Sequence, residues 1–301
     1  MKHTLKITII LVLVFLAAQV VGLYVVDSYV DHETLVETGN LTYSELPLSI
    51  ERPEVEESSS FIYIMIAILL GTVLLLLLIR FRQRNLWRIW FLLAVVICLT
   101  IAFSAFMNQT LALILAIVLA VPKIFKPNPL LHNITEIFLY GGLAAIFVPI
   151  MNLFAAVMLL LLISIYDMYA VWKSKHMVKL AEFQNQSKIF AGLSIPYELP
   201  KKSEVKSTTK KSITQKEVKT AILGGGDIGF PLIFAGVVMK GLLTSNIELI
   251  FLKIMIIPLI TSIALLILLL KSKKDTFYPA MPFLTAGCLV GYGILQLIVL
   301  L

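Results

Sequence analysis

Two aspartates stand inside runs of apolar residues, where an ionisable side chain is out of place. Asp167 lies within the apolar stretch 160–171, and Asp227 lies within the stretch 221–231. An ionisable residue inside a membrane span costs roughly 2.5–3.5 kcal/mol on insertion scales and usually marks function. The two aspartates are therefore the first candidates for chemistry.

The two carboxyl groups are expected at nearly the same depth. Asp167 lies six residues before Lys173 on a helix that descends to the inner face, and Asp227 lies eight residues after Lys219 on a helix that rises from it. At about 1.5 Å per residue, the aspartates then lie roughly 9 Å and 12 Å from the inner boundary. The two predicted helices are adjacent in sequence and antiparallel, so the carboxyls could face each other.

A pair of carboxyl groups a few ångströms apart shares one proton, because both cannot easily be ionised together. This is the working state of an aspartyl protease, in which the ionised group takes a proton from water and the protonated group polarises the scissile carbonyl. The chain has neither a GxSxG nor an HExxH motif, which would indicate a serine or a zinc peptidase. Two other interpretations stay open: a transporter or ion-leak channel with a proton relay, and a scaffold whose aspartates only bond helices together.

Two short segments near the aspartates have unusual backbone properties. Gly224, Gly225 and Gly226 weaken a helix and free N–H and C=O groups, with which an extended substrate could pair as an added strand. Pro279-Ala280-Met281-Pro282 lies at the inner end of the last apolar run, where its prolines remove backbone donors and distort the first helical turn. Packing of small residues and an ordinary helix start are the simpler explanations for these segments.

The composition indicates which elements must position these residues. Apolar residues make up 59% of the 301-residue chain and charged residues 14%, whereas soluble domains have about 45–50% and about 25%. The apolar runs are continuous rather than alternating, which predicts membrane-spanning helices and excludes a barrel. Two cysteines within apolar runs and four scattered histidines predict no disulfide and no metal site. The net charge of +7 is attributed to membrane topology rather than to nucleic acid binding.

A span needs about 20 mostly apolar residues. Nine runs meet this description, with the fourth and fifth the hardest to separate: 7–26, 60–79, 89–107, 109–125, 134–150, 151–172, 221–243, 247–270 and 277–300. The turn between the fifth and sixth runs is so short that these helices are expected to be antiparallel neighbours. The chain then divides into a six-helix part (1–172), a basic cytoplasmic loop (173–219) with a mobile linker at 201–216, and a three-helix part (220–301).

Charges near the ends of the runs predict the orientation. Basic residues, Lys123 among them, gather in alternate loops, and the segment 27–59 between them is acidic, with Arg52 as its one lysine or arginine. Because basic loops stay inside, the N-terminus is expected in the cytoplasm and the C-terminus outside. Four charged residues near the ends of runs are expected to reach water, two of them directly (Glu136 and Glu248) and two by snorkelling (Lys240 and Lys253).

Three motifs on the sixth, seventh and ninth runs resemble those of one family. Tyr166-Asp167 resembles the YD motif of presenilins and signal peptide peptidases, Gly224-Gly225-Gly226-Asp227 their GxGD motif, and Pro279-Ala280-Met281 their PAL motif. The resemblance covers the whole chain and is nearest to archaeal presenilin homologues. Met281 replaces the usual leucine, a change of similar volume.

This resemblance implies a GxGD-type intramembrane aspartyl protease with Asp167 and Asp227 as the catalytic pair. It also implies that the other motif residues shape the active site and bind substrate: Tyr166, Gly224, Gly225, Gly226, Pro279, Ala280 and Met281. An N-terminus inside corresponds to the presenilin branch, since signal peptide peptidases are inverted. The expected partners are the lipid bilayer of the cell membrane and single-span segments with their N-termini outside. No cofactor, metal or nucleic acid is expected, and homo-oligomerisation is left open.

Overall fold

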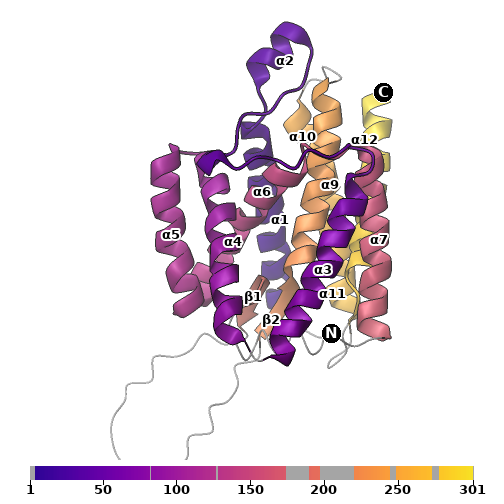
Figure 1. Ribbon diagram of the computed structural model, residues 1–301. Helices are drawn as coiled ribbons and strands as arrows, with labels where there is room; N and C mark the ends of the chain where they lie inside the picture. The colour runs from indigo at the N-terminus through magenta and orange to yellow at the C-terminus, as the bar shows by residue number, and fades with distance from the viewer. Residues whose placement is uncertain are drawn as a thin grey trace, which may run out of the picture.

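The computed structural model is a bundle of long helices, and the two termini of the chain lie at opposite ends of this bundle (Figure 1). It describes residues 4–81, 83–126, 128–173, 190–196, 220–244, 249–272 and 278–300, apart from the side chains of Ile79 and Arg84. The basic loop 173–219 is thus described only at its start and at one short segment, and the linker expected at 201–216 lies outside the described residues.

The elements follow one another along the chain in the following order: α1 (Leu5–Ser28), α2 (His32–Thr38), the 3-10 turn η1 (Pro47–Ser49), α3 (Ser60–Arg80), α4 (Arg84–Ser104), α5 (Gln109–Phe125), α6 (Pro129–Phe147), α7 (Leu153–Trp172), β1 (Gly192–Pro196), β2 (Thr220–Gly224), α9 (Gly225–Thr244), α10 (Ile250–Ile254), α11 (Ile256–Lys271) and α12 (Met281–Leu300). Successive long helices alternate in direction, and α2 stands beyond one end of the bundle (Figure 1).

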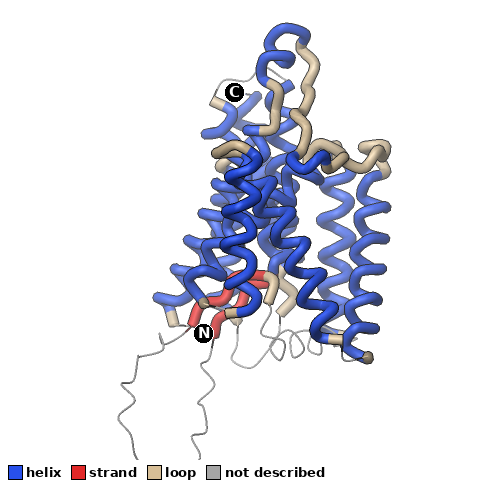
Figure 2. The backbone as a smooth tube through the Cα atoms, turned by 60° about the vertical axis from the view of Figure 1, so that its left-hand side comes forward, coloured by secondary structure: helices blue, strands red, loops and turns tan. Residues whose placement is uncertain are grey.

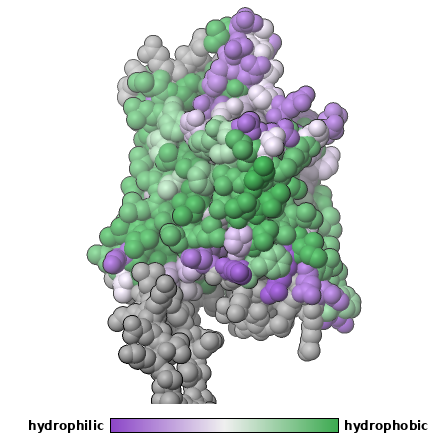
Figure 3. Space-filling model, turned by 90° about the vertical axis from the view of Figure 1, so that its left-hand side faces the viewer, coloured by the Kyte–Doolittle hydropathy of each residue, from purple (hydrophilic) through white to green (hydrophobic). Residues whose placement is uncertain are grey.

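The surface of the bundle has the character of a membrane protein. Among the described residues, eight helices are long and apolar enough to cross a membrane, and α5, with 17 residues, is a shorter apolar helix. Figure 3 shows an apolar band around the middle of one face, with hydrophilic residues at both ends of it. The prediction of a polytopic helical membrane protein is therefore confirmed, whereas the count of nine spans and the orientation stay predictions.

Three asparagines begin three successive helices. The side chains of Asn108, Asn128 and Asn152 each accept a backbone N–H from the first turn of α5, α6 and α7, at 2.9 Å in every case. An asparagine at this position satisfies a donor that the helix itself cannot. Because proline is tolerated at the first helical position, α6 begins at Pro129 and not at residue 134 as predicted.

Helix α9 lies at the centre of the bundle. It packs against α1, α6, α7, α11 and α12 and is the most buried of the eight long apolar helices. The prediction that α6 and α7 are neighbours is wrong, since they diverge from their short turn and each packs against α9 instead. Close approach of α1 to α9 needs a glycine, because a Cβ at Gly22 would lie 2.2 Å from a methyl carbon of Leu232.

A two-stranded antiparallel sheet interrupts the helices at the end of the bundle where the chain begins (Figures 1 and 2). Strands β1 and β2 pair from Gly192 opposite Gly224 to Pro196 opposite Thr220. The prediction of a helix over 221–243 is therefore wrong at its start, and α9 begins only at Gly225. Pairing with β1 gives partners to backbone groups of β2, so the chain stays extended as far as Gly224 and the helix includes only the second and third glycines.

The eighth apolar run is also divided. The short helix α10 ends at Ile254, and α11 begins at Ile256. Pro258 has no N–H to donate to the carbonyl group of Ile254, four residues earlier, so the helical ladder is broken there.

Charged side chains fasten the segment between α1 and α3 to the end of the bundle where the chain terminates. The Arg52 guanidinium donates to the carbonyl groups of Ser44 at 2.9 Å and Ala145 at 3.3 Å. Lys240 Nζ donates to Glu57 at 2.7 Å and to the carbonyl groups of Pro149 and Met151 at 3.0 and 3.1 Å. Lys240 therefore reaches out of α9 toward this segment.

Candidate active site

Asp167 lies near the end of α7, and its carboxylate accepts a hydrogen bond from the start of α12. The side chain is buried, with 6% exposure, and Oδ2 accepts the backbone N–H of Met281 at 3.1 Å. Met281 is the first residue of α12, and a helix leaves its first N–H groups without internal acceptors. The predicted segment Pro279-Ala280-Met281 thus presents a backbone donor to one of the two predicted aspartates.

Asp227 lies in the first turn of α9, directly after strand β2. Its carboxyl group is turned back over the end of the strand, since a Cβ at Gly224 would lie 3.2 Å from Oδ2. The carboxylates of Asp167 and Asp227 are near enough to interact electrostatically. The Asp167 carboxylate lies against the N-terminal end of α12 and Asp227 belongs to the first turn of α9, so a helix dipole stabilises negative charge at each.

The predicted distance of Asp227 from the inner membrane boundary rests on a wrong assumption. The value of roughly 12 Å assumed helical rise from Lys219 onward, whereas Thr220–Gly224 is extended strand. The corresponding assumption for Asp167 is correct, because α7 is helical from Leu153 to Trp172.

Gly225 and Gly226, which follow Gly224, have different surroundings. A Cβ at Gly225 would lie 2.6 Å from the Tyr140 hydroxyl oxygen, so α6 and the start of α9 are in close contact. Gly226 is exposed, and a Cβ there would meet the ring of Phe230 at 3.2 Å. Space is therefore most restricted at Gly225.

Tyr166 does not share the surroundings of its neighbour Asp167. Its hydroxyl lies 3.2 Å from Thr72 Oγ1 and so links α7 to α3. One turn from Asp167 on α7, the hydroxyl of Ser164 lies 2.7 Å from that of Thr285, which links α7 to α12. These contacts hold α7 between two helices at the level of the aspartate.

The prolines around Met281 do not distort α12. Phe283 and Leu284 both donate to the carbonyl group of Ala280 at 3.1 Å, so the first turn is regular. Pro282 lies within this turn, where no N–H donor is needed. The side chains of Pro279 and Met281 are buried, and that of Met281 joins the apolar core.

Glu136 and Lys123 are buried, contrary to their predicted places near water. Glu136 is 0% exposed and Lys123 3% exposed, and Lys123 Nζ lies 2.5 Å from Glu136 Oε1. Glu136 Oε2 accepts hydrogen bonds from Tyr140 and, at 3.1 Å, from the backbone N–H of Gly192. The only signal for this cluster in the sequence is one acid and one base at facing ends of consecutive apolar runs.

A second polar contact that the sequence did not predict lies beside Asp227. The side chain of Gln19 on α1 is fully buried and donates to the carbonyl group of Ile228 at 2.9 Å. Pro231 has no N–H for the carbonyl group of Asp227 itself, so the helical ladder is interrupted at this turn. The first turn of α9 is thus held partly by a neighbouring helix.

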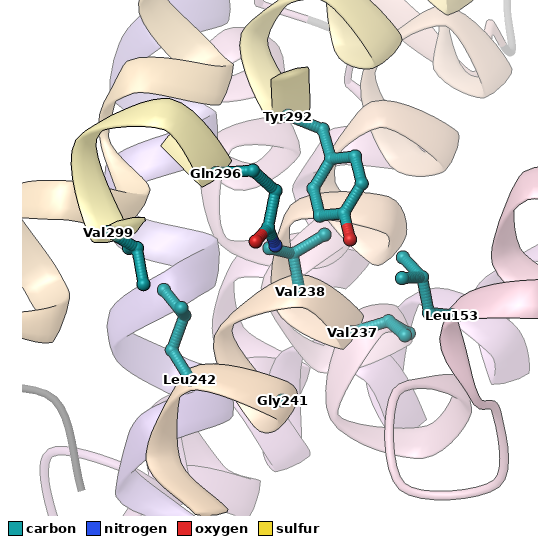
Figure 4. Close-up of a pocket in the computed structure, with 8 residues that line it drawn as sticks. All are labelled: Leu153, Val237, Val238, Gly241, Leu242, Tyr292, Gln296 and Val299. Atoms are coloured by element: carbon teal, nitrogen blue, oxygen red, sulfur yellow. The ribbon is translucent and has the colours of Figure 1, made fainter. Parts of the chain in front are cut away.

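A cavity of about 200 Å³ lies away from the aspartates, between α7, α9 and α12. Figure 4 shows Tyr292 and Gln296 of α12 near Val237 and Val238 of α9. The lining residues come from the start of α7 and the second halves of α9 and α12, whereas Asp167 and Asp227 lie at the opposite ends of α7 and α9. The cavity is therefore separate from the candidate site.

The fold and the site together define a polytopic helical membrane protein with two interacting carboxylates inside its helical bundle. The sequence profile of a family described as signal-peptide peptidase, presenilin aspartyl protease matches residues 21–300. The chain belongs to this family, and its enzyme class is that of an aspartic endopeptidase that acts within the membrane. A search of curated proteins found no match.

Two solved structures have a similar fold. Both are of a presenilin family intramembrane aspartate protease, one in space group C222 and one in P2. The first has a TM-score of 0.58 and 16% identity over 94% of each chain, and the second has a TM-score of 0.60 and 17% identity over 96% of each chain. At this level of identity, the similarity extends to the fold alone.

Proposed function

We propose that the protein hydrolyses peptide bonds within the transmembrane segments of single-span proteins, with Asp167 and Asp227 as its catalytic pair. The observation that carries this proposal is the placement of both carboxylates at helix N-termini, with the N–H of Met281 bonded to Asp167 at 3.1 Å. A buried donor of this kind holds the Asp167 carboxylate in place and stabilises its ionised form. Membership of an aspartyl protease family supports the same assignment.

In the proposed mechanism, the pair holds one proton before substrate is attacked. The ionised carboxylate removes a proton from water, and the water oxygen forms a bond to the scissile carbonyl carbon. The protonated carboxyl gives its proton to the carbonyl oxygen, which yields a gem-diol intermediate without acylation of the protein. Collapse of this intermediate breaks the C–N bond as a proton passes to the amine nitrogen.

The substrate must unwind before it is cut. An intact helix hides its peptide carbonyls in internal hydrogen bonds, and no water replaces these bonds in the bilayer core. The extended strand β2, which ends at Gly224 and leads directly to Asp227, supports a mode in which the unwound segment pairs with nearby backbone as an added strand. Residues 224–226 and 279–281 are then the places where substrate approaches the protein.

For the topology we propose nine spans in the cell membrane, with α5 as the fourth span and the N-terminus in the cytoplasm. The sheet and the two aspartates then lie toward the cytoplasmic side, with the acidic segment around α2 outside. Basic residues at the ends of α3, α5 and α11 support this orientation, since the last turns of these helices contain Arg80, Lys123 and Lys271.

The test is proteolysis of a purified single-span substrate, with products identified by mass spectrometry. Asp167→Asn and Asp227→Asn should each abolish cleavage and leave the folded protein intact. Asp31→Asn is the matched control, because it removes a carboxylate of the exposed segment outside the bundle and should cleave normally. Substantial cleavage by either single variant would contradict the pair, and Asp-dependent ion flux through liposomes without proteolysis would instead indicate the channel alternative.

A further inference from the structure

A buried polar cluster connects α5, α6 and strand β1 beside the candidate site. Its central residue, Glu136, is fully buried and has a partner at each carboxylate oxygen. Oε1 faces the Lys123 ammonium at 2.5 Å, and Oε2 accepts from the Tyr140 hydroxyl and from the Gly192 backbone N–H. Lys123 also donates to the hydroxyl of Thr135 at 2.9 Å. A charge buried this deeply is stable only while its partners stay in place.

The same face of α6 holds strand β1 along its length. His132 Nε2 lies 2.7 Å from the carbonyl oxygen of Gly192. The side-chain amide of Asn133 donates to the carbonyl group of Ser194 at 2.8 Å and accepts the Ser194 N–H at 2.9 Å. Together with the bond from Gly192 to Glu136, these contacts satisfy both backbone groups of two residues in β1. They therefore define the position of the strand relative to α6.

Strand β1 in turn sets the position of the residues that precede Asp227. Gly192 is paired with Gly224 in the sheet, and the N–H of Gly225 donates to the carbonyl group of Ala191 at 3.1 Å. Tyr140 completes the contact from the other side, because its hydroxyl occupies the space where a Cβ of Gly225 would lie. The Tyr140 hydroxyl therefore has two roles: it limits how closely α6 and the start of α9 approach each other, and it donates to Glu136.

We infer that Glu136, Lys123 and Tyr140 are positioning residues that set the place of the Asp227 carboxylate through the β1–β2 sheet. None of the three is required to touch substrate, since Glu136 acts through Gly192, Tyr140 through Gly225 and Lys123 through Glu136. This inference rests on the proposed function, because Asp227 is taken as one of the catalytic pair. Its consequence is that removing the cluster lowers kcat per folded molecule by a larger factor than it changes the KM for substrate.

Tyr140→Phe is the mildest test, and the chain contains a matched control. Tyr29 is also buried, with 6% exposure, and its hydroxyl donates to the carbonyl group of Ile101 at 2.8 Å, at the opposite end of the bundle. Each Tyr→Phe change removes one buried hydrogen bond, which Tyr140 donates to a carboxylate and Tyr29 to a neutral carbonyl group. We expect Tyr140→Phe to lower kcat by roughly threefold to tenfold, a change on the scale of one such bond. Tyr29→Phe should leave kcat unchanged.

Glu136→Gln tests the carboxylate but leaves the Lys123 ammonium buried without a countercharge, so this variant risks unfolding. The double variant Lys123→Met with Glu136→Gln removes both charges and keeps similar side-chain volumes. It should fold and yet remain slower than the wild type by roughly tenfold, because a neutral amide oxygen accepts from Gly192 and Tyr140 more weakly than the carboxylate oxygen that it replaces. Wild-type kcat in the folded double variant would overturn the inference.

Hydrogen exchange at 192–196 and 220–225, measured by mass spectrometry on the full protein, separates positioning from general stability. Faster exchange in both segments is expected for Tyr140→Phe and the double variant, and not for Tyr29→Phe. Unchanged exchange, or faster exchange with wild-type kcat, would contradict positioning by the cluster. If Asp227→Asn still cleaved substrate, the proposed function would fail, whereas the exchange result would still report whether the cluster holds the sheet.

Discussion

The hydrogen bond from Met281 to Asp167 depends on where one helix begins. The N–H of Met281 is available only because Met281 is the first residue of α12, and a helix that began one turn earlier would use this donor internally. Pro279 and Pro282 favour a helix start at this position, since neither has an N–H to lose. A side chain of similar size can therefore replace the leucine usual at position 281, because the contact to Asp167 uses only the backbone.

Gly225 gives the sharpest test of how closely packed the residues around Asp227 are. A methyl group there would lie 2.6 Å from the Tyr140 hydroxyl and 3.2 Å from its ring, so either Tyr140 or the start of α9 must move. Overpacking of this kind costs about 1–3 kcal/mol. We expect Gly225→Ala to lower the rate of substrate cleavage by roughly tenfold or more.

The control for this change is Gly293→Ala in α12, where a Cβ would meet no atom within 4 Å. Alanine there should stabilise the helix slightly, by about 0.5–1 kcal/mol, and leave cleavage unchanged. Equal rates for the two variants would show that the close approach of α6 to α9 is not needed for activity.

Among the elements, the helices could be predicted from hydropathy, but the sheet could not. Thr220-Ala221-Ile222-Leu223 is as apolar as the helix that follows, so a hydropathy window joins strand and helix into one run. Strand β1 lies within a basic loop, and only its pairing with β2 and its bonds to α6 make it a strand. The aspartates, glycines and prolines near the site could be singled out from residue type alone. Their partner Glu136 could not be, because its burial depends on how α5, α6 and β1 meet.

Helix α2 provides a pH-dependent element outside the membrane-spanning segments. Asp31 is its N-cap and accepts the N–H of Thr34 at 3.0 Å and the Thr34 hydroxyl at 2.6 Å. These hydrogen bonds lower the pKa of the Asp31 carboxyl from its ordinary value of 3.8. A lowered pKa in the folded state means that the cap stabilises α2 above the ordinary pKa and is lost as the pH falls through the folded value.

We therefore expect α2 to be fully formed at neutral pH and to lose order below about pH 4. Hydrogen exchange over 32–38, corrected for the intrinsic pH dependence of exchange, measures this change. Asp31→Asn retains a capping oxygen and should remove the pH dependence without melting the helix. Loss of order at the same pH in this variant would assign the transition to another group.

At the scale of the whole molecule, the proposed topology places opposite ends of the bundle in different compartments. Both native cysteines are buried, so single new cysteines report on their own positions. With a reagent that does not cross membranes, applied to intact cells, Glu45→Cys should be labelled. Val205→Cys, beyond the described residues, should be labelled only after the membrane is opened. The reverse pattern would contradict the orientation and, with it, the assignment to the presenilin branch.

The short helix α5 has a consequence for the lipid around the protein. Its 17 residues span about 26 Å at a rise of about 1.5 Å per residue, less than the roughly 30 Å of a typical hydrocarbon core. Lys123 in its last turn is bonded inside the bundle and cannot extend toward the headgroups. In the proposed nine-span topology, the bilayer beside α5 must therefore thin to match it, at a cost that grows with acyl chain length. In vesicles of phosphatidylcholines of increasing chain length, we expect cleavage to be fastest in the thinner bilayers and to decline as hydrophobic mismatch strains the α5–α6 contact that holds Glu136.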